Sequence, residues 1–366
     1  MVKAIICGVI LITLTTLTAC GGSTSSSSSG TILGGAKQGN DLILTNFVST
    51  FAGFANYSGS ADGVAAVARF SAPTGIASDG TNIYVVDSSS YTIRKIDISK
   101  GLVTTIAGTA GVCSSADGTG AAAKFSWISG ITTDGTNIYV IDHYTDTIRK
   151  IAISTGVVTT VGGYGAGWSF YNNPDITTDG TNLYVAVNGG YNKINKIDIS
   201  TGEVTTIAGK AGILNSFGSS DGVGAAASFT DPTGITTDGT NLYVADSENY
   251  TIRKIRISTG EVTTIAGKAG VAGSADGIGT DARFVFPNHI TTDGTNLYVT
   301  DHYSYTIRKI VISTGAVTTI AGTAGAYGSA DGNGAIARFR NPTGITTDGA
   351  NIYVTDTGNS TIRKIQ

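Results

Sequence analysis

The sequence predicts an all-β fold, a six-bladed β-propeller of four-stranded antiparallel blades. The first observation is a phrase, Ile-x-x-Asp-Gly followed by Asn-(Ile/Leu)-Tyr-Val, that recurs six times with its aspartates at Asp79, Asp134, Asp179, Asp238, Asp293 and Asp348. The second is the short segments between turns, which are rich in Ile, Val, Thr and Tyr and typical of strands. The third is the copy number, because one such unit cannot bury its own core and six favour a closed array.

Each unit divides into four expected strands. In the fourth unit these are GITTD (234–238), NLYVAD (241–246), TIRKIRI (251–257) and VTTIAG (262–267). The intervening DGTN and STGE segments carry the Asp, Asn and Gly that tight hairpin turns require. NLYV is apolar at successive positions, which suits a strand covered on both faces.

The two ends of the chain predict how the ring closes. The chain stops at TIRKIQ (361–366), so the last unit lacks its fourth strand. FVSTFAG (47–53) matches VTTIAG and precedes the first unit. We therefore expect the N-terminal strand to complete the last blade, which removes an exposed edge.

The N-terminus predicts export and a lipid anchor. Residues 1–19 read as a signal peptide, with Lys3 followed by an uncharged apolar run that is short for a membrane span. Leu17-Thr18-Ala19-Cys20 resembles a bacterial lipobox, which implies cleavage before Cys20 and diacylglycerol on its thiol. We expect residues 20–44 to form a lipidated Gly/Ser-rich tether and residues 45–366 to form the propeller.

The resemblance to a lipobox also implies a location in the bacterial cell envelope. Gly21 follows Cys20, which in a Gram-negative cell favours the outer membrane. The membrane contact would be through the lipid anchor alone.

Charge and cysteine content exclude several classes of protein. The chain has 23 basic and 26 acidic side chains; loss of Lys3 with the signal leaves 22 − 26 = −4. Nothing is basic enough to predict nucleic-acid binding. Cys113 would be the only free thiol after lipidation of Cys20, so we expect no disulfide framework and interpret Cys113 as a small semi-buried filler. We expect a monomer without a cofactor.

The full pattern resembles the bacterial NHL-repeat propellers. The residues that carry the resemblance are SADGxGxxARFxxPxGI, DG-x-N-x-YVxD, TIRKI and VTTIAG, and they cover 46–366. The resemblance implies a six-bladed propeller. It leaves the function open, because that family includes lyases, RNA binders, sensor domains and interaction scaffolds.

Charged residues that recur in register indicate a structural role. Five units have an acid after the second strand and an arginine in the third, giving the pairs Asp87–Arg94, Asp142–Arg149, Asp246–Arg253, Asp301–Arg308 and Asp356–Arg363. The third unit has Val187 and Asn195 instead. Joint loss predicts that the two side chains pair within each blade, because losing one would leave a buried charge uncompensated.

The SADG phrase supplies a second recurring acid, at Asp62, Asp117, Asp221, Asp276 and Asp331. We expect it to cap a short helical turn or to close an Asx turn. A calcium loop is the alternative, but this phrase supplies one carboxylate where calcium needs several oxygen ligands.

Residues that break the register are the candidates for binding. Strand direction puts the loop before the first strand and the loop between the second and third strands on one face, here called the upper face. The third unit departs most there, with GGYGAGWSFYNNPDI (162–176) in place of the SADG phrase. Aromatic and amide side chains of this kind suit a saccharide or an extended peptide. The candidate binding residues are Trp127, Tyr164, Trp168, Tyr171, Asn172, Asn173, Asn188, Tyr191 and His289.

An alternative is that these aromatic residues refill the part of the core that the third unit lost together with its SADG phrase. His289 replaces a glycine at the mouth of the axis in the fifth unit, and His143 and His302 lie in opposite units. We therefore expect no metal site.

Two function hypotheses from different classes follow. The first is a non-catalytic scaffold that binds a protein, peptide or glycan on its upper face. The alternative is a metal-assisted lyase or hydrolase at the mouth of the central channel, around His289 and Asp175. A third possibility is a repeat array expanded for bulk or adhesion, in which the upper loops have no role.

Overall fold

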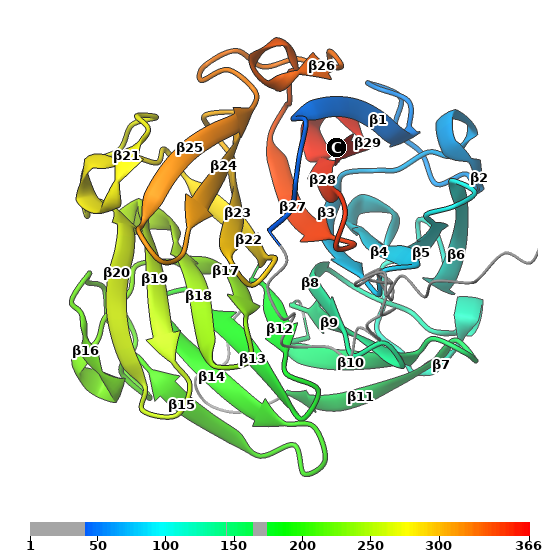
Figure 1. The fold of residues 1–366 in the computed structure, drawn as a ribbon. Coiled ribbons are helices and arrows are strands. Elements are labelled where there is room, and N and C mark those ends of the chain that lie inside the picture. The colour runs from blue at the N-terminus through cyan, green and yellow to red at the C-terminus, as the bar shows by residue number, and fades with distance from the viewer. Residues whose placement is uncertain (1–40, 144, 164–173) are drawn as a thin grey trace, which may run out of the picture. The chain divides into compact units, whose positions relative to one another are not determined.

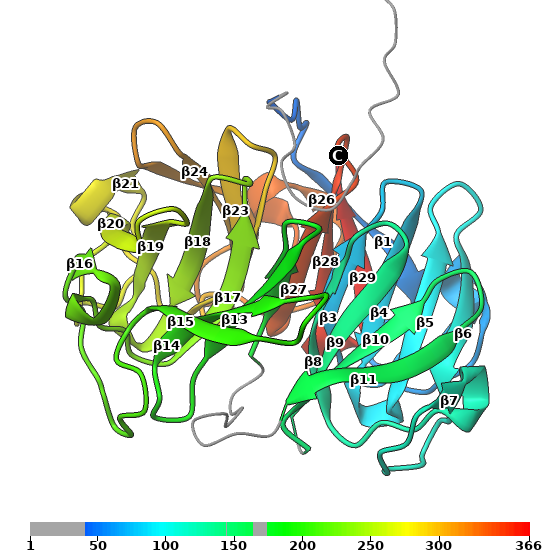
Figure 2. The same cartoon turned by 90° about the horizontal axis from the view of Figure 1, so that it is seen from below.

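Six antiparallel sheets surround a central axis as the blades of a propeller (Figure 1), and Figure 2 shows the same ring turned by 90°. The computed structural model describes residues 41–366 except 144 and 164–173. The predicted all-β six-bladed propeller is confirmed. No helix in the described part of the chain is long and apolar enough to cross a membrane. The predicted signal peptide and Cys20 lie outside the described residues.

The first three blades follow the chain in order. Blade 1 comprises β2 (Gly63–Val64), β3 (Pro73–Ser78), β4 (Asn82–Asp87), β5 (Thr92–Asp97) and β6 (Leu102–Gly108). Blade 2 comprises β7 (Gly118–Thr119), β8 (Ile128–Thr133), β9 (Asn137–Asp142), β10 (Thr147–Ala152) and β11 (Val157–Gly163). Blade 3 comprises β12 (Ile176–Thr178), β13 (Asn182–Val187), β14 (Lys193–Asp198) and β15 (Val204–Ala208).

The last three blades repeat this order. Blade 4 comprises β16 (Gly222–Val223), β17 (Pro232–Thr237), β18 (Asn241–Asp246), β19 (Thr251–Arg256) and β20 (Glu261–Gly267). Blade 5 comprises β21 (Gly277–Ile278), β22 (Pro287–Thr292), β23 (Asn296–Asp301), β24 (Thr306–Val311) and β25 (Ala316–Ala321). Blade 6 comprises β26 (Gly332–Asn333), β27 (Pro342–Thr347), β28 (Ile352–Asp356), β29 (Thr361–Ile365) and β1 (Phe47–Gly53).

Short 3₁₀ turns interrupt the loops. Five follow the two-residue outer strands: η1 (Ala65–Val67), η3 (Gly120–Ala122), η4 (Gly224–Ala226), η6 (Gly279–Asp281) and η7 (Gly334–Ile336). Three follow the second long strand of a blade: η2 (Ser88–Ser90), η5 (Ser247–Asn249) and η8 (Thr357–Asn359).

Five blades have one strand more than the sequence predicts. The extra strand is two residues long, comes from the SADG phrase and pairs with the outer strand of the blade, as with Gly63 opposite Val103. Blade 3 lacks the phrase and has four strands. A two-residue strand is too short to show an alternating pattern, which is why the sequence did not reveal it.

The hydrophobic core lies between neighbouring blades. Tyr84, Val86 and Ile93 of blade 1 pack against Ile128 and Ile138 of blade 2, and each further pair of blades repeats this arrangement. The second strand of each blade is therefore covered on both faces, as its continuous apolar run predicts.

The N-terminal strand closes the ring as predicted. Strand β1 pairs antiparallel with β29, with Val48 opposite Ile365, so blue and red ribbons lie side by side in Figure 1. The segment before it also contacts the ring. Leu42 is buried between blades 5 and 6, and its N–H donates to Asp293 Oδ2 at 3.2 Å. These contacts begin ahead of residue 45, where the sequence places the start of the propeller.

Candidate functional site

The recurring arginine of a blade is buried between two carboxylates. In blade 4, Arg253 Nη1 lies 2.7 Å from Asp246 Oδ2 and Arg253 Nη2 lies 2.8 Å from Asp221 Oδ1. The guanidinium carbon is 5.0 Å from the ring centroid of Phe229, a cation–π distance. In blades 1, 2, 5 and 6 the first contact spans 2.8 to 3.5 Å and the second 2.6 to 2.9 Å. These charges therefore link the strands within each of these five blades.

The expected capping role of the SADG aspartates is wrong. Asp221 accepts hydrogen bonds from the N–H and the hydroxyl of Thr264 on the outer strand, besides its ion pair with Arg253. The 3₁₀ turn η4 begins after Val223 and has no side-chain cap. The Asp221 carboxylate thus joins the segment of the short strand β16 to β19 and β20. Sequence reasoning missed this because the partners are separated by 32 and 43 residues.

Blade 3 lacks all three members of this arrangement. Val187 and Asn195 replace the acid and the base, and no SADG phrase is present. Asn195 Oδ1 accepts instead from the Thr206 hydroxyl at 3.0 Å. Blade 3 therefore has a neutral hydrogen bond where the other five blades have an arginine between two carboxylates.

The predicted binding residues lie in different surroundings. Tyr164, Trp168, Tyr171, Asn172 and Asn173 fall outside the described residues. Trp127 is 54% exposed and stands beside His143, with 5.7 Å between their rings. Cys113, expected to be semi-buried, is exposed.

The upper loop of blade 3 is packed against its neighbour. Asn188 is fully buried, and the hydroxyl of Ser216 from blade 4 donates to the Tyr191 carbonyl at 2.9 Å. Asn192 Oδ1 accepts from the N–H of Asp231 at 3.0 Å. The loop before blade 4 therefore packs against the upper loop of blade 3. Lys193 is buried here as well, and burial lowers its pKa.

Exposed aromatic side chains gather on the upper face. Seven aromatic residues are exposed among those described, and only Phe47 lies away from the upper loops. We call the other six the upper-rim aromatics: Phe54, Tyr57, Trp127, Phe217, Tyr303 and Tyr327. They come from the loops of blades 1, 2, 4, 5 and 6, so the described part of the upper rim presents aromatic rings to solvent at five blades.

Part of this rim forms a small cluster on blade 5. The Tyr303 ring lies 5.1 Å from Phe286 and 4.8 Å from His302. The imidazole Nδ1 of His302 lies 3.0 Å from the Pro342 carbonyl of blade 6, so it also links two blades. Burial lowers the pKa of His302, which favours the neutral ring.

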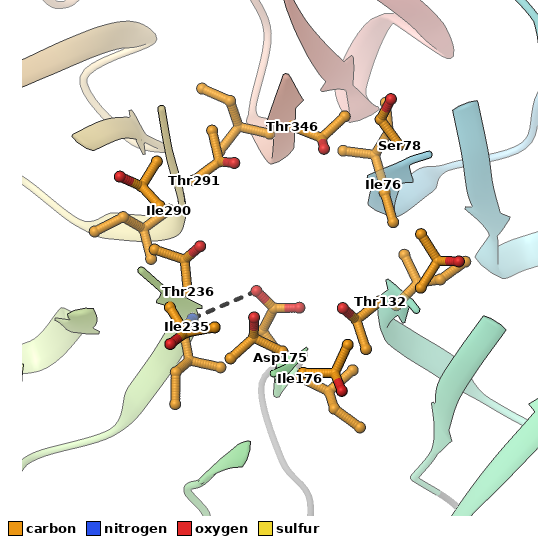
Figure 3. A pocket seen from close by; sticks show the side chains of 18 of the residues that line it. Ile76, Ser78, Thr132, Asp175, Ile176, Ile235, Thr236, Ile290, Thr291 and Thr346 are labelled. Carbon is orange, nitrogen blue, oxygen red and sulfur yellow. Dashed lines mark hydrogen bonds between the residues drawn. The ribbon is translucent and has the colours of Figure 1, made fainter. Parts of the chain in front are cut away.

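The innermost strands line a central channel of about 120 Å³ (Figure 3). Its lining is made of Ile, Ala, Ser and Thr side chains, and Asp175 is the charged residue among them. Figure 3 shows the Asp175 carboxylate between the strands, with Oδ2 accepting from the Ile235 N–H at 3.4 Å. Drug-sized ligands occupy pockets of about 300–1,000 Å³, so such a ligand would have to bind above the channel rather than inside it.

Asp175 and His289 meet at the upper mouth of this channel. His289 Nδ1 lies 3.3 Å from Asp175 Oδ2, although the residues belong to blades 3 and 5. Both side chains are almost fully buried. The sequence places both residues at the mouth of the channel but does not predict that their side chains meet. In the described part of the chain, no three His, Cys, Asp or Glu side chains gather to hold a metal ion.

Comparison with known proteins adds the family. No family model matches the chain. It is 35% identical over 150 residues to protein SUPPRESSOR OF QUENCHING 1 of Arabidopsis thaliana, covering 38% of this chain and 14% of that protein. It is 32% identical over 151 residues to NHL repeat-containing protein 2 of Bos taurus, covering 37% of this chain and 21% of that protein. The chain is an NHL-repeat propeller.

Solved structures extend the likeness over the ring. A Bacteroides thetaiotaomicron protein of unknown function matches 87% of this chain and 75% of its own chain, with a TM-score of 0.68 and 25% identity. An auxiliary nutrient binding protein from the same organism matches 87% of this chain and 76% of its own chain, with a TM-score of 0.65 and 19% identity. The second likeness shows the fold alone. The NHL-repeat propeller spans about a fifth or less of the curated relatives above.

Proposed function

We propose that this NHL-repeat propeller is a non-catalytic binding protein of the bacterial cell envelope that takes a glycan on its upper face. The observation that carries the proposal is the gathering of six of seven exposed aromatic residues on the upper loops. The recurring Asp and Arg side chains form ion pairs with one another inside the blades. The aromatic rim is therefore the surface left for recognition.

The proposed ligand class follows from the chemistry of this rim. Aromatic faces stack on the apolar faces of sugar rings, while nearby amide and hydroxyl groups hydrogen-bond sugar hydroxyls. His302 stands beside Tyr303, and its Nε2 lies 3.2 Å from the amide nitrogen of Asn341. Similar propellers from Bacteroides thetaiotaomicron and Bacteroides ovatus are called auxiliary nutrient binding proteins, which supports binding as the class of function. A protein or peptide partner is the other outcome of the test.

The proposed anchor agrees with this choice of face. Lipidation at Cys20 would tether the propeller through the segment that ends at Asp41. Asp41 contacts Lys309 and Asn296 of blade 5, at the end opposite the upper loops. A propeller held from that end would direct the aromatic rim away from the membrane.

The test is a binding experiment with the full chain in detergent. Malto-, cello-, xylo- and manno-oligosaccharides are titrated while tryptophan fluorescence is followed, with envelope protein fractions titrated in parallel. We expect saturable oligosaccharide binding that a Tyr303→Ala, Tyr327→Ala variant weakens by about tenfold, since each aromatic contact contributes about 0.5–1.5 kcal/mol. The matched control, Val204→Ala, removes an exposed side chain at the lower end of blade 3 and should bind normally. A parent chain that binds no oligosaccharide and no envelope protein would refute the proposal.

A second candidate draws on the Asp175–His289 pair. A metal-assisted lyase or hydrolase at the channel mouth would use these side chains. A catalytic zinc site takes about three protein ligands, and this mouth supplies a pair, so we rank binding first. Metal bound stoichiometrically, together with an activity that His289→Gly abolishes, would reverse that ranking.

A further inference from the structure

Six equivalent positions surround the upper mouth of the channel, and four of them are glycine. They are Gly75, Gly130, Asp175, Gly234, His289 and Gly344. A Cβ added to any of the four glycines would lie 2.2 to 2.6 Å from a backbone oxygen of the next blade. The ring thus strongly selects glycine. Both departures from it place an ionisable side chain at the axis.

The two departures are matched to one another. Asp175 Oδ2 lies 3.3 Å from His289 Nδ1, across the intervening Gly234 of blade 4. Asp175 Oδ1 lies 3.0 Å from the point where a Cβ of Gly130 would sit, so glycine there gives the carboxylate room. A carboxylate on Nδ1 fixes the imidazole tautomer and leaves Nε2 of the neutral ring as a hydrogen-bond acceptor.

That acceptor has no partner. His289 is 3% exposed, and its Nε2 is buried without a hydrogen bond in the described part of the chain. The preceding residue, Asn288, is 5% exposed and its Oδ1 is likewise buried and unpaired. Blades 1, 4 and 6 have Thr-Gly at these two positions, where the Thr74 and Thr233 hydroxyls are hydrogen-bonded. Blade 5 therefore has two buried acceptors without a partner where those blades have a hydrogen-bonded threonine and a glycine, and leaving buried acceptors unpaired destabilises the fold.

The unpaired acceptors at the mouth of the channel indicate which kind of ligand would complete the site. Two acceptors beside a carboxylate call for a ligand that donates hydrogen bonds. We propose that Asn288, His289 and Asp175 form a subsite at the axis that receives the hydroxyl groups of one sugar residue. This inference rests on the proposed glycan function and deepens it. The Phe286–Tyr303 cluster on the same blade would stack the neighbouring part of the ligand.

The experiment compares the parent with a variant that has the Thr-Gly sequence of blades 1, 4 and 6 at residues 288 and 289. In the full chain in detergent, Asn288→Thr and His289→Gly are combined, because blades 1, 4 and 6 already fold with Thr-Gly there. Asp175→Asn keeps the shape of the side chain and removes its charge. The matched control is Ser129→Thr, which restores the threonine of blades 1, 4 and 6 at the mouth of blade 2. Each variant is titrated with the malto-, cello-, xylo- and manno-oligosaccharides, and with a permethylated form of whichever binds.

We expect the restored variant and Asp175→Asn to bind at least tenfold more weakly, and Ser129→Thr to bind as the parent does. Permethylation removes the hydroxyl donors, so it should weaken binding more in the parent than in the restored variant. Unchanged oligosaccharide binding by the restored variant would overturn the subsite and leave the proposed function intact. A parent that binds an envelope protein but no oligosaccharide would overturn the subsite and the glycan together. A parent that binds neither would overturn the binding function as a whole.

Discussion

At the scale of single residues, the molecule is organised by buried arginines. Each of five blades encloses one guanidinium between a buried carboxylate and a half-exposed one, as Arg253 lies between Asp246 and Asp221. A charge buried this deeply is tolerated only with its counter-ions, so the three positions change together. Blade 3, with Val187 and Asn195, shows the neutral alternative within the same chain.

This coupling predicts a non-additive pair of substitutions. Asp246→Ala should lower the free energy of unfolding by about 3–5 kcal/mol, because Arg253 loses its buried partner. Asp246→Val combined with Arg253→Asn, which copies blade 3, should cost less than Asp246→Ala alone. Asp221 would then lose its partner, but its side chain is half exposed to water. Urea unfolding of the three proteins measures both values, and a double variant less stable than the single one would contradict the prediction.

At the scale of the element, the DG-x-N turn is a closed hydrogen-bonding unit. In blade 4, Asp238 accepts from the backbone of Asn241 and from the Tyr243 hydroxyl, at 2.6 and 2.8 Å. Burial would raise the pKa of Asp238, but hydrogen bonds from Asn241 and Tyr243 outweigh it and hold that pKa below its ordinary value. Burial first, and the Asp238 carboxylate second, raise the pKa of Tyr243. All six blades have the same tyrosine, with its pKa raised for the same reasons.

The contribution of this turn to stability should therefore fall at both ends of the pH range. The tyrosine pKa is higher in the folded state than the unfolded value of about 10, so that contribution is complete below pH ~10 and is lost as the pH rises beyond it. The pKa of Asp238 is lower in the folded state, so its contribution to stability is present above pH ~4 and is lost as the pH falls below it. Urea unfolding across the pH range checks both.

A variant isolates the tyrosine part of this behaviour. Tyr243→Phe should remove about one sixth of the alkaline loss and cost about 1–3 kcal/mol at neutral pH, because Asp238 loses a hydrogen bond to a charged group. An alkaline profile unchanged by this substitution would show that the turn tyrosines do not control it.

At the scale of the whole molecule, the ring depends on one non-covalent closure. Blade 6 is completed by β1, and Leu42 adds a buried contact on the way to it. Without β1, the strand β29 would present an unpaired edge, which is a template for pairing with another chain. The segment that closes the ring is also the one that leads to the proposed anchor.

Truncation separates these roles. A chain that begins at residue 54 should be less stable and should self-associate through β29, whereas a chain that begins at residue 41 should remain a monomer. Light scattering after size-exclusion chromatography gives the mass of each species. Equal, monomeric behaviour of both truncated chains would show that β1 is dispensable for closure.

The sequence by itself determined the number of blades, the four long strands of each and the closure of the ring. It could do so because these features depend on local patterns, turn residues and apolar runs, that are repeated six times. The joint absence of acid and base in blade 3 also revealed the partners Asp246 and Arg253 in blade 4, because repeats supply an alignment within one chain.

Only the tertiary structure decided which distant residues meet. It brought Asp221 to Arg253 as the second carboxylate beside that guanidinium. It also placed the loop before blade 4 against the upper loop of blade 3, and Asp175 beside His289 at the mouth of the channel. No strand period encodes these contacts, because each joins residues from separate segments of the chain that only the folded ring brings to within a few ångströms of one another. The candidate binding surface is therefore a property of the closed ring, whereas the blades are a property of the repeat.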